Sequence, residues 1–154
     1  MELLLVMAII AILAAAVLAA LGGVRRSMTK AKATEQSKRL ANAFIYYYHT
    51  YGRWPSLATP PAGPLDIDGM CLTNLTSKST QYNPRGILFL DPDKTWTNGA
   101  TDPWGRPYQY CIAASLDRAA SGVPVEMGSA GSSPVAIWSR GPDGTNSATN
   151  PRSW

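Results

Sequence analysis

The chain begins with an uncharged apolar stretch that a compact domain of the remaining residues could not enclose. Residues Leu3 to Val24 contain no charged side chain, and a single carboxylate, Glu2, precedes them. A helix over this stretch is about 33 Å long at 1.5 Å per residue, which matches the hydrocarbon thickness of a bilayer. The stretch therefore predicts a helix that is buried in a membrane or against copies of itself.

The flanking residues favour a retained helix over a cleaved secretion signal. A cleaved signal has a basic start and a short apolar core, whereas here the start is acidic and the basic residues come afterwards. These residues are Arg25, Arg26, Lys30, Lys32, Lys38 and Arg39. Basic residues beside an apolar span favour the cytoplasmic side or anionic headgroups. Nucleic-acid binding is not indicated, because no aromatic residues alternate with the basic ones and no nucleic-acid motif is present.

The helix is expected to continue well beyond the apolar run, because no proline interrupts Ser27–Tyr51. Gly52, with Pro55 just beyond it, predicts the end. One helix over Met1–Tyr51 would be roughly 75 Å long. Side chains at helical spacing form one apolar face: Leu40, Ala41, Phe44, Tyr47, Tyr48 and Tyr51.

The glycine pair Gly22-Gly23 is the weakest part of this helix, since each glycine costs about 1 kcal/mol relative to alanine. The pair marks either a kink or melted stretch, or a place where helices can pack closely.

After the helix the sequence becomes rich in Pro and Gly, and three segments follow from this change. Residues 1–24 are an anchor or filament-core helix, 25–52 its amphipathic continuation, and 53–154 a loop-rich β domain. The candidate strands are Gly86–Leu90, Pro107–Ile112 and Pro134–Trp138, with Val123–Met127 as a weaker fourth. The fold class is α+β, with a long helix packed on a small antiparallel sheet through the Leu40–Tyr51 face.

The sequence offers little for catalysis, so an enzyme is not expected. His49 is the only histidine, and it lies in an aromatic run where a surface or packing role is the simpler interpretation. Neither a zinc-type spacing nor a Gly-rich phosphate loop is present. Two cysteines, Cys71 and Cys111, suggest a disulfide in a domain outside the cytoplasm; the alternative is two buried thiols.

Four segments resemble the type IV pilin superfamily. The run "ELLLVMAIIAILAAAVLAAL" is similar to its N-terminal helix. "YYYHTYGRWPS" resembles the helix end of the major pseudopilin of type II secretion, where a Tyr-rich turn precedes Gly-Arg-aromatic-Pro. "TDPWGRPYQY" and "VAIWSRGPDG" resemble two C-terminal segments of that family, in the same order. The resemblance implies a pilin-like fold.

The resemblance also gives Glu2 a role. It matches the glutamate that the superfamily keeps inside its apolar segment for assembly. A carboxylate within a membrane span is costly and is usually paired, and the implied partner is the α-amino group of a neighbouring subunit. The alternative is a Glu2 that lies in the headgroup region.

The function implied by the resemblance is that of a filament subunit. N-terminal helices would form the core of a helical polymer, and the protomer would be anchored in the bacterial inner membrane before assembly. Its partners would be copies of itself, an assembly ATPase and an inner-membrane platform. The filament would be a periplasmic secretion pseudopilus or an extracellular pilus. A monomeric membrane-tethered domain and a minor tip pilin are the alternatives.

Two departures from the family concern the N-terminus and the C-terminal loop. Four residues usually precede the glutamate, but here only Met1 does; either the leader and first mature residues are missing, or Met1 begins the ordered chain. The family's C-terminal loop carries acids that bind calcium. Here the possible ligands are Asp143, Asn146 and Asn150. Because amides hold a divalent cation less well than carboxylates, packing around Trp138 and Trp154 is expected to fix the loop, without a cofactor.

Overall fold

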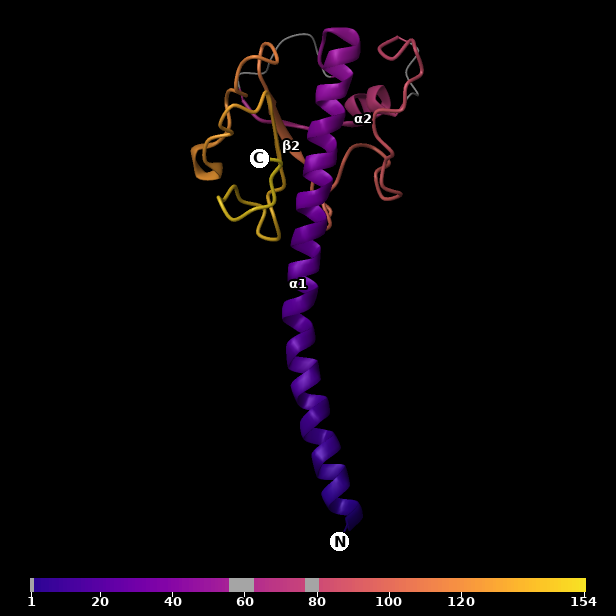
Figure 1. Cartoon of the computed structure of the whole chain (residues 1–154), viewed down its shortest axis with the longest axis vertical. Helices are drawn as coiled ribbons and strands as arrows, with labels where there is room; N and C mark the ends of the chain where they lie inside the picture. Colours follow the sequence, from indigo (N-terminus) through magenta and orange to yellow (C-terminus); the bar gives the residue numbers. More distant parts are fainter. Residues whose placement is uncertain (1, 56–62, 77–80) are drawn as a thin grey trace.

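A single long helix, α1, carries a small globular domain at its C-terminal end (Figure 1). The structure is a computed structural model that describes residues 2–55, 63–76 and 81–154, without the side chains of residues 2 and 17–21. Helix α1 spans Glu2–Tyr51 without a break. Its N-terminal half extends away from the domain, and Ala33 is the first buried side chain among those described. The chain is therefore α+β, as predicted.

The predicted end of α1 is confirmed. Gly52 adopts a positive φ of 68°, and its amide donates to the carbonyl of Tyr48 at 2.8 Å. This is the backbone conformation in which glycine commonly ends a helix.

The glycine pair does not melt the helix. Gly22 and Gly23 both lie within α1, and a β-carbon at either position would meet no atom within 4 Å. Their surface is thus open to a neighbouring helix, and close helix packing at this point stays a prediction.

The sheet has three antiparallel strands in the order β1-β2-β3. They are β1 (Leu65–Asp66), β2 (Gln109–Ile112) and β3 (Val135–Trp138). Strands β2 and β3 confirm two predicted strands, and Tyr110 pairs with Ile137 at the centre of their ladder.

Two other predicted strands are wrong. Residues Gly86–Leu90 form no strand: Leu88 makes one isolated bridge to Thr76, and the following two amides donate to the carbonyl of Leu75. Within Val123–Met127 the chain forms a short 3₁₀ helix, η1 (Val125–Met127). A second helix, α2 (Gly69–Leu75), begins at Asp68, whose carboxylate accepts from the amide of Cys71. Neither α2 nor the two-residue β1 was predicted.

The sheet packs on α1 through the predicted face. Four of the six predicted residues of that face are buried and two are partly buried. Successive side chains of a strand point to opposite sides, so each strand contributes to two clusters. Tyr110, Ile112, Val135 and Ile137 lie in the cluster with α1. Cys111, Ala136 and Trp138 lie in the second cluster, on the other side of the sheet.

Because of this alternation, the predicted disulfide is not formed in the structure. Cys71 belongs to the cluster with α1 and Cys111 to the second cluster, and both are free buried thiols. Burial raises the pKa of Cys111 to about 11. Burial also raises the pKa of Cys71, and the nearby carboxylate of Asp68 adds to this effect.

We expect both thiols to react slowly with iodoacetamide in the folded protein and completely after unfolding, because burial hides them and keeps them protonated. Mass spectrometry of protein alkylated during lysis, without reductant, measures both. Recovery of a peptide pair linked through Cys71 and Cys111 would contradict the free thiols and restore the disulfide.

Candidate assembly surface

The N-terminal part of α1 presents apolar side chains to solvent on all sides. Every described side chain from Leu3 to Ala16 is exposed, and Leu3 and Ile12 are 75% and 69% exposed. A helix that is apolar all round is normally buried, and monomeric soluble proteins rarely expose an apolar surface of this extent. This part of α1 therefore has the character of an interaction surface.

The side chain of Glu2 lies outside the described residues, so its predicted pairing stays a prediction. In the part of the chain that the structure describes, no helix combines the length and the apolarity that a membrane span requires.

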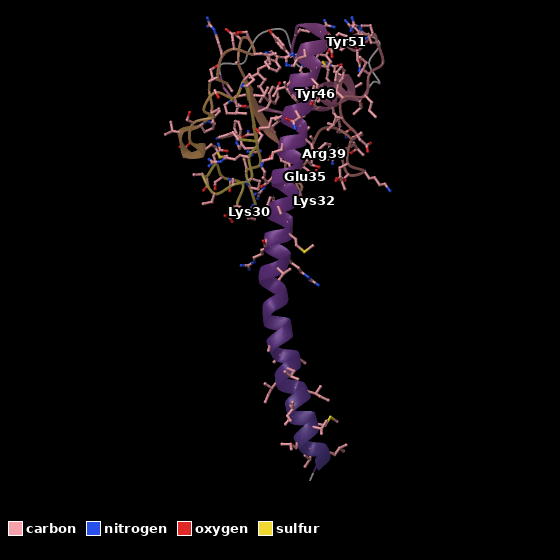
Figure 2. The ribbon with its side chains drawn as sticks, in the orientation of Figure 1. Lys30, Lys32, Glu35, Arg39, Tyr46 and Tyr51 are labelled. Atoms are coloured by element: carbon pink, nitrogen blue, oxygen red, sulfur yellow. The ribbon has the colours of Figure 1, made fainter. Side chains whose placement is uncertain are left out.

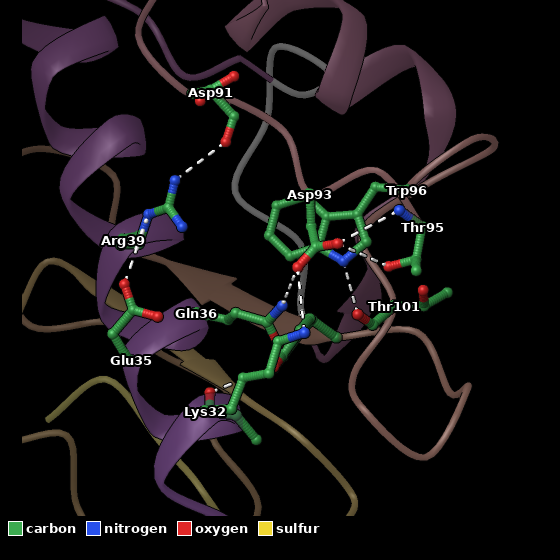
Figure 3. Close-up of polar contacts among 11 residues, drawn as sticks. Lys32, Glu35, Gln36, Arg39, Asp91, Asp93, Thr95, Trp96 and Thr101 are labelled. Carbon is green, nitrogen blue, oxygen red and sulfur yellow. Dashed lines mark hydrogen bonds and ion pairs between the residues drawn. The ribbon is translucent and has the colours of Figure 1, made fainter. Parts of the chain in front are cut away.

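A carboxylate at the edge of the domain ties α1 to the segment that follows residue 90. Asp93 accepts from the amide of Gln36 at 3.0 Å and lies 3.3 Å from the ammonium of Lys32 (Figure 3). The backbone amide and hydroxyl of Thr95 donate to its other oxygen. The Thr95 amide is the main cause that lowers the pKa of Asp93, and Lys32 contributes to it. We call this group the Asp93 clamp.

Two further contacts extend the attachment along α1. Arg39 donates to the backbone carbonyl of Asp91 at 3.0 Å and pairs with Glu35 at 3.6 Å (Figure 3). On the buried side, the hydroxyl of Tyr108 donates to the side-chain oxygen of Gln36 at 2.9 Å. The polar side chains of α1 thus add contacts that hold the domain on the helix.

The tyrosine run at the end of α1 has two different environments. Tyr46 is 65% exposed, and His49 is also exposed. Tyr47 is buried, and its hydroxyl donates to the carbonyl of Tyr82. Tyr51 donates to the side-chain oxygen of Asn83 at 2.6 Å. The run is thus largely a packing element, and only Tyr46 and His49 are open to a partner.

The C-terminal loop is folded around a guanidinium. Arg106 donates to the carbonyl of Gly141, and a β-carbon at Gly144 would lie 2.9 Å from its Cζ atom. The backbone of Arg106 is held in turn by the buried carboxylate of Asp102, which also accepts from the hydroxyl of Ser139. This places a positive charge against the loop that carries Asp143.

The possible calcium ligands do not form a fitting donor set. Calcium requires several oxygen ligands around one point. Asp143 is exposed, and the side-chain oxygen of Asn146 already accepts from the indole of Trp138 at 3.0 Å. Asn150 donates to the carbonyl of Thr145 within the same loop. With Arg106 beside the loop, a second cation would be repelled, and we assign no role to calcium. Among the described residues, no three acidic, histidine or cysteine side chains converge as a metal site.

Aromatic packing contributes to holding the end of the chain. The rings of Trp138 and Trp154 meet edge to face with centroids 6.1 Å apart. The amide of Ser153 donates to the carbonyl of Ile137 at 2.9 Å, and Arg152 bridges to Trp138. The last residues therefore extend the edge of β3.

Several residues that position this surface were not predicted. The buried polar side chains of Gln36, Asn83 and Asp102 each join distant segments. An isolated Asn or Asp in a turn-rich sequence has the same pattern whether it joins segments or merely forms a turn. One of these residues could have been recognised from the sequence. An Asp side chain often accepts a hydrogen bond from the backbone amide two residues later, which forms a turn, and Asp102 in "TDPWG" has the composition of such a turn.

Asp93→Asn should lower the melting temperature by roughly 3 to 6 °C at neutral pH, for a loss of about 1 kcal/mol. Because folding lowers the pKa of Asp93, its contribution is complete above the ordinary aspartate pKa of about 4 and is lost as the pH falls through the lowered pKa. The difference in melting temperature between Asp93→Asn and wild type should therefore disappear at a pH below that lowered pKa. Thermal unfolding of the full chain in mild detergent measures this.

Asp91→Asn is the matched control, because Asp91 contacts Arg39 through its backbone carbonyl. Equal melting temperatures for Asp93→Asn and wild type at neutral pH would refute the Asp93 clamp.

Trp154→Ala should lower the melting temperature by several degrees, since losing the edge-to-face contact and its buried area costs ~1–3 kcal/mol. Trp154→Phe should retain most of the stability.

The melting temperature of the wild type should be the same in excess EDTA and in millimolar calcium. A marked rise with calcium would show instead that metal holds the loop, with Asp143 as the first residue to test.

Neither family models, nor curated proteins, nor solved structures give a match to this chain.

Proposed function

We propose that this protein is a structural subunit that polymerises into a helical, type IV pilus-like filament, as the major pseudopilin of a type II secretion system. The observation that carries the proposal is the exposed apolar part of α1, in its described residues, which extends from a domain whose core it does not enter. Such a surface is covered when N-terminal helices of many copies pack together. The four resembling segments support the choice of family.

A head-to-tail arrangement of copies fits this shape. If the helices pack side by side with an axial offset between copies, each helix contacts its neighbours through two different surfaces, so the interface is heterologous and can repeat without closing. Before assembly the same apolar helix would lie in the bacterial inner membrane, and an assembly ATPase and an inner-membrane platform would add the subunits. Pairing of Glu2 with the α-amino group of a neighbour would fix the axial register.

Three alternatives remain close to this proposal. An extracellular pilus would use the same helix packing, and its subunits would be recovered in sheared surface fibres. A minor tip pilin would be recovered in few copies. A monomeric membrane-tethered domain would be recovered as single subunits in mild detergent. The segments "DPWG" and "SRGPDG" favour the secretion pseudopilin among these.

Glu2→Ala should leave the protein in the membrane fraction but reduce its assembly into fibres at least tenfold, because one unpaired partner is left in an apolar setting. Negative-stain microscopy and immunoblotting of fibres measure assembly. Glu126→Ala is a matched control, since Glu126 is an exposed carboxylate in η1, outside α1. Normal fibre yield from Glu2→Ala would exclude the pairing role, and the absence of fibres from the wild type would exclude the filament.

A further inference from the structure

An open pocket of about 660 Å³ lies between α1 and the C-terminal loop. Three basic residues of α1, Arg25, Arg26 and Lys30, line one side, and we call them the basic collar. Trp104 lines the pocket as well, together with Asp143 and Asn150 from the loop. Figure 2 places Lys30 at the margin of the domain, where the projecting part of α1 begins.

The charges of the collar are not neutralised within the described chain. The two ion pairs found among the described residues join Lys32 to Asp93 and Arg39 to Glu35, and neither pair involves the collar. Asp143 is the one carboxylate that lines the pocket, against three cations. Guanidinium groups bind phosphate oxygens through paired hydrogen bonds, so the pocket is suited to an anion with phosphate chemistry.

The position of the pocket indicates where such a phosphate comes from. Arg25 directly follows Val24, the last residue of the apolar run. If that run lies in a bilayer, its helix of about 33 Å ends at the headgroups, where tryptophan is also enriched. The described apolar side chains N-terminal to the collar are exposed, and acyl chains could cover them. A free phosphate would leave these side chains uncovered.

We propose that the pocket holds the phosphate of an anionic phospholipid headgroup, a proposal that rests on the membrane anchoring set out above. The collar would bind the phosphate, Trp104 would pack beside the glycerol backbone, and the acyl chains would run along α1. The lipid would thereby fix the height and orientation of the protomer at the membrane surface before assembly.

The test uses the full chain in nanodiscs made with equal amounts of phosphatidylglycerol and phosphatidylcholine. After extraction into mild detergent, native mass spectrometry measures the ratio of the two lipids retained by the protein. The wild type should retain phosphatidylglycerol preferentially. The triple variant Arg25→Gln, Arg26→Gln, Lys30→Gln should lower the ratio by about fivefold or more, since each cation near an anionic surface contributes substantially. The control triple Lys38→Gln, Lys94→Gln, Arg118→Gln removes the same charge from exposed sites outside the pocket and should leave the ratio unchanged.

Two single variants distinguish specific binding in the pocket from non-specific electrostatic attraction to the membrane. Asp143→Asn removes the repelling carboxylate and should raise the ratio, a gain that misfolding would not produce. Trp104→Ala keeps the charge and should lower the ratio. A fall of the same size in both triple variants would show non-specific attraction and overturn the site.

The remaining outcomes assign the pocket to other ligands. If inorganic phosphate stabilises the wild type but not the collar variant, and no lipid preference is found, the pocket binds free phosphate and the lipid proposal is wrong. If the collar variant keeps its lipid preference but forms fewer fibres, the collar meets acidic side chains of a neighbouring copy, and the lipid proposal is again wrong. Flotation with vesicles of phosphatidylcholine alone tests anchoring separately: failure to float would contradict the proposed membrane step, and flotation without a preference for phosphatidylglycerol would contradict only the site.

Discussion

The packing of the C-terminal half of α1 against the sheet is the contact on which the domain depends. Phe44 and Tyr47 are fully buried there, and their rings lie 5.3 Å from those of Tyr110 and Phe89. Burying one such side chain stabilises the fold by ~2–3 kcal/mol. A sheet whose longest strands have four residues could not stand alone in water. The helix therefore supplies the second layer that the strands need.

Because the strands are short, most backbone amides and carbonyls of the domain need hydrogen-bond partners outside the sheet. Asn83 does this for two segments: its amide donates to the carbonyls of Asn74 and Ile87, and its oxygen accepts from Tyr51. Asp102 does the same for the turn before β2 and for Ser139. Since a buried polar group without a partner is costly, these networks define the loops much as strand pairing defines a larger sheet.

This distinction explains what could be predicted from the sequence. The apolar period of α1 and the apolar runs of β2 and β3 extend over enough residues to be recognised, and Gly52 marks the helix end. Gly86–Leu90 has the composition of a strand, but the amides of Phe89 and Leu90 donate to Leu75 at the end of α2 instead of to a neighbouring strand. The two-residue β1 is too short to show any period. Of the candidate site, the exposed apolar surface follows from composition, whereas the Asp93 clamp depends on contacts between residues far apart in the sequence.

The two halves of α1 are energetically separate, and this bears on how assembly can be studied. No described side chain before Ala33 is buried, and both hydrophobic clusters begin beyond it. A substitution near Glu2 therefore removes nothing from the core of the domain, whereas a substitution at Phe44 or Tyr47 removes packing without altering the exposed helix. Contacts that do not share partners contribute independently to stability. A change in fibre yield that leaves the unfolding of the domain unaltered can thus be assigned to contacts between copies or with lipid.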